Sequence, residues 1–322
     1  MASIPSDYPV THPRRGLGDR LGDHGLKAIT LAAALAAVVL LGAIVWKVME
    51  LAWPAISYYG LSFLTSDTWD PVRKEFGALS FIYGTVISSF LALLIATPLA
   101  VAIALWLSEL APRGVRGVIG SLVEMLAAIP SVVLGLWGIL VLGPYLSHTL
   151  EPWLHDHLGF LPIFGPPSST GTGMFTAALI LTIMVVPIVA SICRELFLQV
   201  PSELEEGALA LGATRWEMIR GVILPATRTG IAAAVILGLG RALGEAIAVT
   251  QVIGGGTKIT RNIFGPSDTI ASKIASSYQG AASGLEAASL LYLAAILLVI
   301  GLLTNFVAQI VVRRFDPLRG AR

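Results

Sequence analysis

Charged side chains are scarce in this sequence. They make up 13% of its 322 residues, whereas roughly a quarter of the residues of a soluble domain are charged. Hydrophobic residues make up 55% and the mean hydropathy is +0.81, so we expect most of the chain to face lipid. The net charge is +1 and no long basic run is present, which excludes nucleic acid as a natural partner because phosphate backbones bind clustered Lys and Arg.

Cysteine and an N-terminal apolar segment are also lacking. Cys193 is the single cysteine, so no intramolecular disulfide can form, and we interpret it as a small buried hydrophobe. A secretory signal peptide would need an early apolar stretch, but residues 1–27 are polar and rich in Pro, Gly and charge. We therefore expect residues 1–27 to form a disordered polar tail in the cytoplasm.

Long apolar runs dominate the remainder. A membrane helix needs about 20 mostly apolar residues. Runs that meet this need lie at 28–46, 76–108, 117–142, 171–193, 229–253 and 287–312. They predict an all-α, polytopic membrane protein with six transmembrane helices, divided into the tail at 1–27, a first helix and outer loop at 28–75, and a membrane core at 76–322.

Basic residues are distributed unevenly between the two sides of this predicted topology. Fourteen Lys and Arg fall in the tail, the turn at 113–116, the segment 194–228 and the C-terminus, whereas five fall in the opposite loops. Cytoplasmic loops are enriched in Lys and Arg. The distribution therefore predicts that both termini are cytoplasmic.

An outer segment carries His148, His155 and His157 next to Glu151 and Asp156. Such residue types can bind a metal. In an extended chain, however, alternate residues point to opposite sides, which would separate the rings of His155 and His157. No second cluster completes a ligand shell, so we expect no metal site.

The cytoplasmic segment 201–225 is more organised than a connecting loop requires. Ser202 with Glu205, and Thr214 with Glu217, have the spacing of capping boxes, in which each side chain bonds an early backbone N–H of a helix. The polarity of the segment excludes a membrane span. These signals predict two short helices.

Gly212 lies between the two helices, where a residue in the left-handed conformation would end the first, and Pro225 would follow the second. Each helix carries an apolar stripe, formed by Leu204, Ala208 and Leu211 on the first and by Trp216, Ile219 and Ile223 on the second. The stripes could pack on the inner ends of the membrane helices or dock in a groove of another protein, and the pattern alone supports both.

Two charges, Arg241 and Glu245, interrupt the run 229–253. A charge at this depth costs at least about 2.5–3.5 kcal/mol, so it indicates a function or a structural ion pair. The cation-first order is the weaker arrangement at i, i+4 and favours a role in a pathway. Gly240 and Gly244 would let another helix approach closely. Because a guanidinium fork matches tetrahedral oxyanions, an anionic substrate is our hypothesis.

Residues 201–225 resemble the EAA loop of ABC importer permeases, the element that docks on the ATP-hydrolysing subunit, with Gly207 standing where that family has Ala. The resemblance implies a type I importer permease with the MetI-like fold and a cytoplasmic coupling loop. Its ATPase-coupling residues would be Glu205, Glu206, Gly207, Ala208, Gly212, Leu224 and Pro225.

The chain contains no GxxxxGK[ST] phosphate loop. Residues 254–258, GGGTK, are similar to part of one, but no strand is expected before them and no Ser or Thr follows the Lys. We interpret them as a flexible helix end. We therefore expect this chain to bind no cofactor and to catalyse no reaction, with ATP and magnesium used by partner ATPase chains.

Four stretches, at 76–89, 107–112, 127–139 and 238–255, are similar to PstC-type phosphate permeases. This resemblance implies phosphate as the substrate, Arg241 and Glu245 as part of its pathway, and the bacterial cytoplasmic membrane as the location. It also implies a PstA-type second permease, two PstB-type ATPases and an extracytoplasmic PstS-type binding protein. The alternatives are an ABC permease for molybdate or sulfate and a secondary transporter, which would have no ATPase to dock.

The predicted topology can be tested with fused reporters. We expect reporters placed after Arg116, after Ser202 and at the C-terminus to report the cytoplasm, and one inserted near His155 to report the outer side. A cytoplasmic signal near His155 would contradict the six-helix topology.

Overall fold

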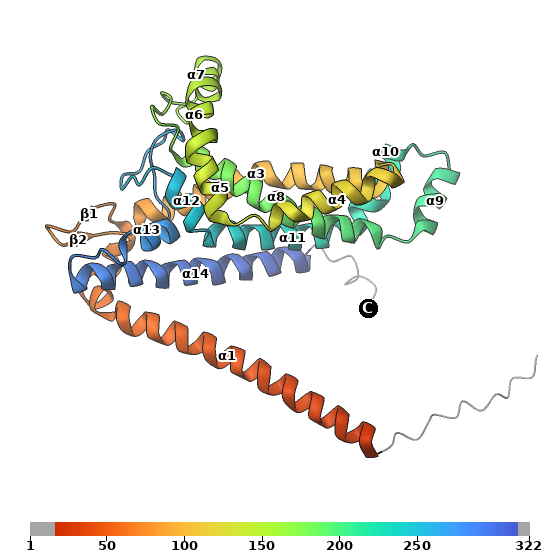
Figure 1. The fold of residues 1–322 in the computed structure, drawn as a ribbon, viewed down its shortest axis with the longest axis horizontal. Coiled ribbons are helices and arrows are strands. Elements are labelled where there is room, and N and C mark those ends of the chain that lie inside the picture. Colours follow the sequence, from red (N-terminus) through yellow and green to blue (C-terminus); the bar gives the residue numbers. More distant parts are fainter. Residues whose placement is uncertain (1–16, 315–322) are drawn as a thin grey trace, which may run out of the picture. The chain divides into compact units, whose positions relative to one another are not determined.

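A computed structural model describes residues 17–314 (Figure 1). The described residues divide into two compact units, with the boundary between Glu50 and Leu51. Within residues 17–314, six helices are long and apolar enough to cross a membrane: His24–Tyr59, Leu79–Leu110, Ser131–Leu158, Met174–Leu198, Arg215–Gly244 and Gly284–Ile310. The predicted all-α membrane fold is confirmed, although several boundaries differ.

The first helix is longer than expected. Helix α1 spans Leu17–Tyr59, whereas we expected a disordered tail up to residue 27 and a helix end at Lys47 and Glu50. These two charges pair on the helix surface, with Lys47 Nζ 3.0 Å from Glu50 Oε1, so they continue the helix rather than end it. The prediction of a disordered tail is therefore wrong for residues 17–27, which are helical. Residues 1–16 lie outside the described part of the chain.

Helices α3 (Leu79–Leu105), α8 (Met174–Leu198), α11 (Leu224–Gly244) and α14 (Gly284–Arg314) run alongside one another in the second unit (Figure 1). Helix α8 packs against both α3 and α11. Alanines at every fourth position of α3 are fully buried: Ala92, Ala96, Ala100 and Ala104. Such a stripe of small residues lets two helix backbones approach closely, as is typical of membrane bundles.

The expected third span, 117–142, is broken in the structure. Helix α4 (Arg113–Ala127) ends before Pro130, and α5 (Ser131–Trp137) begins after it. Proline disfavours the helical conformation of the residue before it, which explains the break within an apolar run. The path then continues through π-helical η2 (Gly138–Leu142), α6 (Gly143–Tyr145), π-helical η3 (Leu146–Leu150) and α7 (Glu151–Leu158).

The histidines of the outer segment therefore lie on a helix, not on an extended chain as expected. His155 Nδ1 is 3.0 Å from the carbonyl oxygen of Phe164, and His157 Nδ1 is 2.8 Å from that of Trp153. Within residues 17–314, no group of three or more His, Cys, Asp or Glu side chains is placed to hold a metal ion.

Short elements complete the two ends of the bundle. Near the hairpin β1 (Trp69–Asp70) and β2 (Glu75–Phe76) lie α2 (Ser62–Thr65) and α13 (Ile270–Ser277). At the opposite end lie π-helical η1 (Trp106–Leu110), α9 (Ser202–Ala210) and α10 (Arg215–Met218) (Figure 1). These ends correspond to the predicted outer and cytoplasmic sides.

A buried charge cluster joins the elements of the predicted outer end. Lys273 Nζ lies 5.1 Å from the ring centroid of Trp69 and 5.8 Å from that of Phe81, within the range of cation–π attraction. Asp268 is 4% exposed and accepts a 2.9 Å bond from Thr269 N. Burial raises the pKa of Asp268 to about 6, although the Lys273 charge opposes the shift.

The raised pKa of Asp268 predicts a pH-dependent stability. Its carboxyl group binds a proton more tightly in the folded state than in the unfolded state, so the contribution of Asp268 to stability is greatest below about pH 4 and is lost as pH rises through 6. We expect the free energy of unfolding to fall by up to about 3 kcal/mol over this pH range in the wild type, and this fall to be absent from the Asp268→Asn variant. Thermal unfolding at pH 4 to 7 checks it, with exposed Asp67→Asn as control; parallel wild-type and Asp268→Asn profiles would contradict it.

Candidate functional site

The predicted fifth helix, 229–253, is not continuous. Helix α11 ends at Gly244, Glu245 takes an extended conformation (φ −72°, ψ 122°), and α12 resumes at Ile247 and ends at Val252. Arg241 thus lies in the last turn of α11 rather than at a helix centre. A basic residue followed by glycine is typical of a helix end, but the apolar residues on both sides of the two charges favoured one continuous span and concealed that signal.

Arg241 and Glu245 do come together at this break. Arg241 Nη2 is 3.0 Å from Glu245 Oε2, and Ala248 N, in the first turn of α12, donates a 3.1 Å bond to Glu245 Oε1. The Glu245 side chain is 4% exposed, whereas that of Arg241 is 45% exposed. The carboxylate is therefore held at both oxygens, while the guanidinium keeps donors that no described residue occupies and that can bind another acceptor.

The surface around Arg241 is open. Positions 237, 240, 241 and 244 share one face of α11, and Leu237 is 57% exposed. Apart from the adjacent residues and the backbone of α11 itself, no atom of the described residues lies within 4 Å of a Cβ placed on Gly240 or Gly244. The close helix approach that we expected at these glycines is therefore not made by the described part of this chain.

The predicted cytoplasmic loop is only partly capped as expected. Thr214 N donates to Glu217 Oε2 at 2.8 Å and Glu217 N donates to Thr214 Oγ1 at 3.3 Å, which confirms this capping box. Gly212 has φ +87°, which confirms the left-handed turn. The expected box of Ser202 and Glu205 is wrong, because Pro201 takes the cap position and Ser202 already belongs to the first turn.

The second cytoplasmic helix does not end at Pro225. Helix α10 continues through the π-helical segment η4 (Ile219–Ile223) into α11, so one helix spans Arg215–Gly244. Proline lacks an N–H and its ring crowds the carbonyl four residues earlier, and a wider π-turn accommodates this. The coupling loop and Arg241 therefore lie near the two ends of one helix about 45 Å long.

Residues 96–317 match the family model described as "Binding-protein-dependent transport system inner membrane component". The chain is 45% identical over its full length to the "Phosphate transport system permease protein PstC" of Mesorhizobium japonicum, all of which is covered. It is 41% identical to the protein of that name from Haemophilus influenzae, covering 91% of this chain and 94% of that one. The chain belongs to the PstC family of binding-protein-dependent transport permeases. It is a multi-pass inner-membrane protein.

Solved structures agree on the fold of this permease. A chain of a bacterial alginate ABC transporter in complex with a pentasaccharide-bound periplasmic protein aligns with TM-score 0.59 and 20% identity, over 90% of this chain and 97% of that chain. A chain of the MetNI methionine transporter in an inward-facing conformation aligns with TM-score 0.52 and 20% identity, over 76% and 95%. The expected MetI-like importer fold is confirmed.

A close contact that we did not foresee supports the broken helix of the permease. Helix α5 packs against α12, and a Cβ on Gly135 would lie 2.9 Å from Gln251 Cδ and 3.0 Å from Ala248 Cα. A larger residue at 135 would therefore push α12 away from α5 and displace Ala248, whose N–H bonds the Glu245 carboxylate. The segments 127–139 and 238–255, distant in sequence, meet here beside the Arg241–Glu245 pair.

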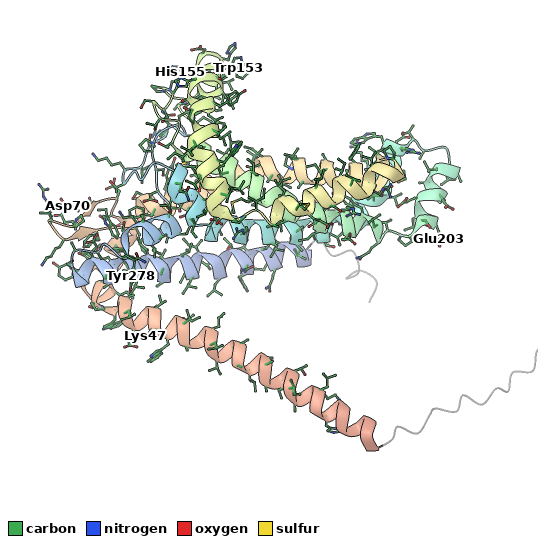
Figure 2. The ribbon with its side chains drawn as sticks, viewed as in Figure 1. Lys47, Asp70, Trp153, His155, Glu203 and Tyr278 are labelled. Atoms are coloured by element: carbon green, nitrogen blue, oxygen red, sulfur yellow. The ribbon has the colours of Figure 1, made fainter. Side chains whose placement is uncertain are left out.

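The apolar stripes of the coupling loop have different surroundings. Ile219 and Ile223 are buried in the bundle, whereas Leu204, Leu211 and Trp216 are 53%, 91% and 64% exposed. Helix α9 stands at the edge of the second unit, where Glu203 points outward (Figure 2). The second helix therefore packs inward through Ile219 and Ile223, as one interpretation predicted, whereas docking of the exposed residues on another protein stays a prediction.

A pocket of about 160 Å³ separates the end of the α3–η1 helix from the coupling loop. It is lined on one side by Glu109 of η1 and on the other by Glu205 and Arg215. Burial, and then repulsion by Glu109 and Glu206, raises the pKa of the Glu205 carboxyl group. The pocket between the loop and the bundle is therefore lined by two carboxylates and one arginine, a relation that sequence spacing could not reveal.

The left-handed turn at Gly212 predicts a position where side chains are poorly tolerated. Gly212→Val would force a β-branched residue into a conformation that costs roughly 1–2 kcal/mol even for ordinary residues, so the angle between α9 and α10 should change. We expect the assembled transporter to lose substrate-stimulated ATPase activity while the chain stays in the membrane. Glu206→Lys should act likewise by reversing a docking charge.

Gly114→Val is the matched control, because Gly114 is exposed on α4, has an ordinary helical conformation and has open space around it. Normal coupling in both Gly212→Val and Glu206→Lys would show that this loop is not the coupling element.

Proposed function

We propose that this chain is the permease subunit of an ATP-driven importer that translocates inorganic phosphate across the bacterial cytoplasmic membrane. The observation that carries the proposal is the half-exposed guanidinium of Arg241 at a helix break within the membrane core. Full-length similarity to permeases named for phosphate transport supports the choice of anion.

Arg241 and Glu245 act together as a charged gate in this proposal. Phosphate carries about one to two negative charges near neutral pH and loses hydration inside the membrane, so it needs a fixed cation. Arg241 supplies that cation through donors that Glu245 leaves free. Because Glu245 is also bonded to Ala248 N, it stays in place when phosphate engages Arg241, and it can compete for the guanidinium when phosphate leaves.

The helix Arg215–Gly244 links this gate to ATP hydrolysis. A docked ATPase that moves the exposed turn at Leu211 and Trp216 would shift the helix that begins at Arg215 and ends beside Arg241. We propose two PstB-type ATPase subunits as the docked partners, with ATP and magnesium bound by them. The permease itself would bind no cofactor and catalyse no reaction.

Two further partners follow from the open surfaces. A PstA-type permease would cover the face of α11 that carries Gly240, Arg241 and Gly244, and so place the gate at a subunit interface. An extracytoplasmic PstS-type protein would deliver phosphate to the outer end. The decisive experiment is radiolabelled phosphate uptake in cells with and without this chain, its neighbours intact.

A permease for molybdate or sulfate is the alternative, since a guanidinium fork accepts any tetrahedral oxyanion. Uptake supported with phosphate but not with molybdate or sulfate would exclude it. A secondary transporter is disfavoured by the exposed coupling loop, and a complex that stimulates no ATPase would revive it.

The gate predicts different defects for its two charges. Arg241→Gln should lower phosphate uptake at least about tenfold with normal assembly, because a charge-assisted contact to the anion is lost. Arg241→Lys should be impaired, since a point charge cannot make a forked contact. Glu245→Gln should slow turnover through slow release. Phosphate uptake measures the transport defect of each variant, and pull-down of the partner subunits measures its assembly.

Arg73→Gln, which removes a 76% exposed arginine of the outer hairpin loop, serves as the control. A double Arg241→Gln, Glu245→Gln variant that restores both assembly and uptake would identify the pair as a structural ion pair and overturn the gate.

A further inference from the structure

Two arginines at the cytoplasmic end of the bundle are more buried than loop arginines need to be. Arg194, on α8, has a side chain that is only 20% exposed. Its Nε atom and the Nε atom of Arg116, on α4, are buried, and neither has a hydrogen-bond partner among the described residues. Buried cationic donors without an acceptor are costly, so these groups call for a counter-charge.

Helices α4 and α8 pack so that Arg194 lies over Gly120. A Cβ on Gly120 would be 3.3 Å from Arg194 Nη1 and 3.5 Å from its Cζ. Residues 116, 120 and 124 are one turn apart, so Arg116 and Glu124 lie on the same face of α4 as this contact. The absence of a side chain at Gly120 thus makes room for the guanidinium between the two helices.

Glu124 offsets this positive charge only weakly. Its Oε1 is 3.4 Å from Arg194 Nη1, longer than a well-formed charged hydrogen bond, and its side chain is 59% exposed. Glu109 of η1 lines a different pocket, together with Glu205 and Arg215. Arg194 is therefore paired with one loosely held carboxylate, and the buried Nε atoms of Arg194 and Arg116 have no acceptor among the described residues.

Helix α4 has its charged face toward the bundle and an apolar face outward. Val115, Val118, Leu122 and Met125 are 42%, 61%, 54% and 67% exposed. In water this arrangement would be unfavourable, whereas beside lipid it is the expected one. If lipid covers this face and the predicted topology holds, the two arginines lie near the cytoplasmic headgroups.

We propose that Arg194 and Arg116 form a binding site for a phosphate group at the cytoplasmic end of the α4–α8 contact, separate from the Arg241–Glu245 gate. Guanidinium groups present Nε and Nη donors in a fork that fits tetrahedral oxyanions. The phosphate group has two sources: an anionic lipid headgroup of the cytoplasmic leaflet, or inorganic phosphate leaving the permease. Glu124 competes with it for Arg194.

The test measures binding, not transport, so it stands or falls independently of the proposed function. The assembled transporter carrying Arg241→Gln, which removes the gate contact, is placed in nanodiscs of phosphatidylcholine alone or with phosphatidylglycerol. Binding of radiolabelled inorganic phosphate and retention of phosphatidylglycerol, by native mass spectrometry, are compared for Arg194→Gln, Arg116→Gln, Glu124→Gln and the exposed outer control Arg261→Gln.

We expect Arg194→Gln and Arg116→Gln each to weaken one of these two ligands by about tenfold or more, and Arg261→Gln to weaken neither. Loss confined to inorganic phosphate identifies an exit site, and loss confined to phosphatidylglycerol identifies a lipid site. Glu124→Gln should strengthen the same ligand. If both arginine variants match Arg261→Gln for both ligands, or if Glu124→Gln weakens binding as they do, the proposal is wrong.

Discussion

The membrane core depends on two interactions of the Glu245 carboxylate: its ion pair with Arg241 Nη2 and the hydrogen bond that it accepts from Ala248 N. A helix that breaks inside a membrane exposes backbone groups that lipid cannot satisfy. Glu245 supplies an acceptor to the new helix start and a counter-charge to the old helix end. The chain can therefore break its helix at this point without leaving the Arg241 charge or the Ala248 N–H unpaired.

This break also places a cation where the bundle is open. The face of α11 around Gly240 and Gly244 is uncovered, and Arg241 projects from it with nearly half its side chain exposed. At the far end of the same helix, Leu211 and Trp216 are uncovered as well. Within residues 17–314, these two surfaces stay uncovered near opposite ends of one helix, and under the proposed function other subunits would cover them.

Packing supplies the precision that such a turn requires. Gly135 lets α5 pack closely against α12, and the buried alanines of α3 let α3 pack closely against α8. Without a hydrophobic driving force between helices in lipid, close backbone contact is a main source of association. Two of the four stretches that resemble phosphate permeases, 127–139 and 238–255, meet at this contact.

The sequence by itself determined the six apolar helices, the Thr214 cap, the Gly212 turn and the pairing of Arg241 with Glu245. Hydropathy, helix caps and i, i+4 spacing depend on residues close together in sequence, so they can be predicted from the sequence alone. Only the tertiary structure decided that the apolar run 229–253 breaks at Glu245 and that 117–142 breaks before Pro130. A break within apolar sequence depends on acceptors and small residues brought from other helices, and spacing along the chain carries no record of them.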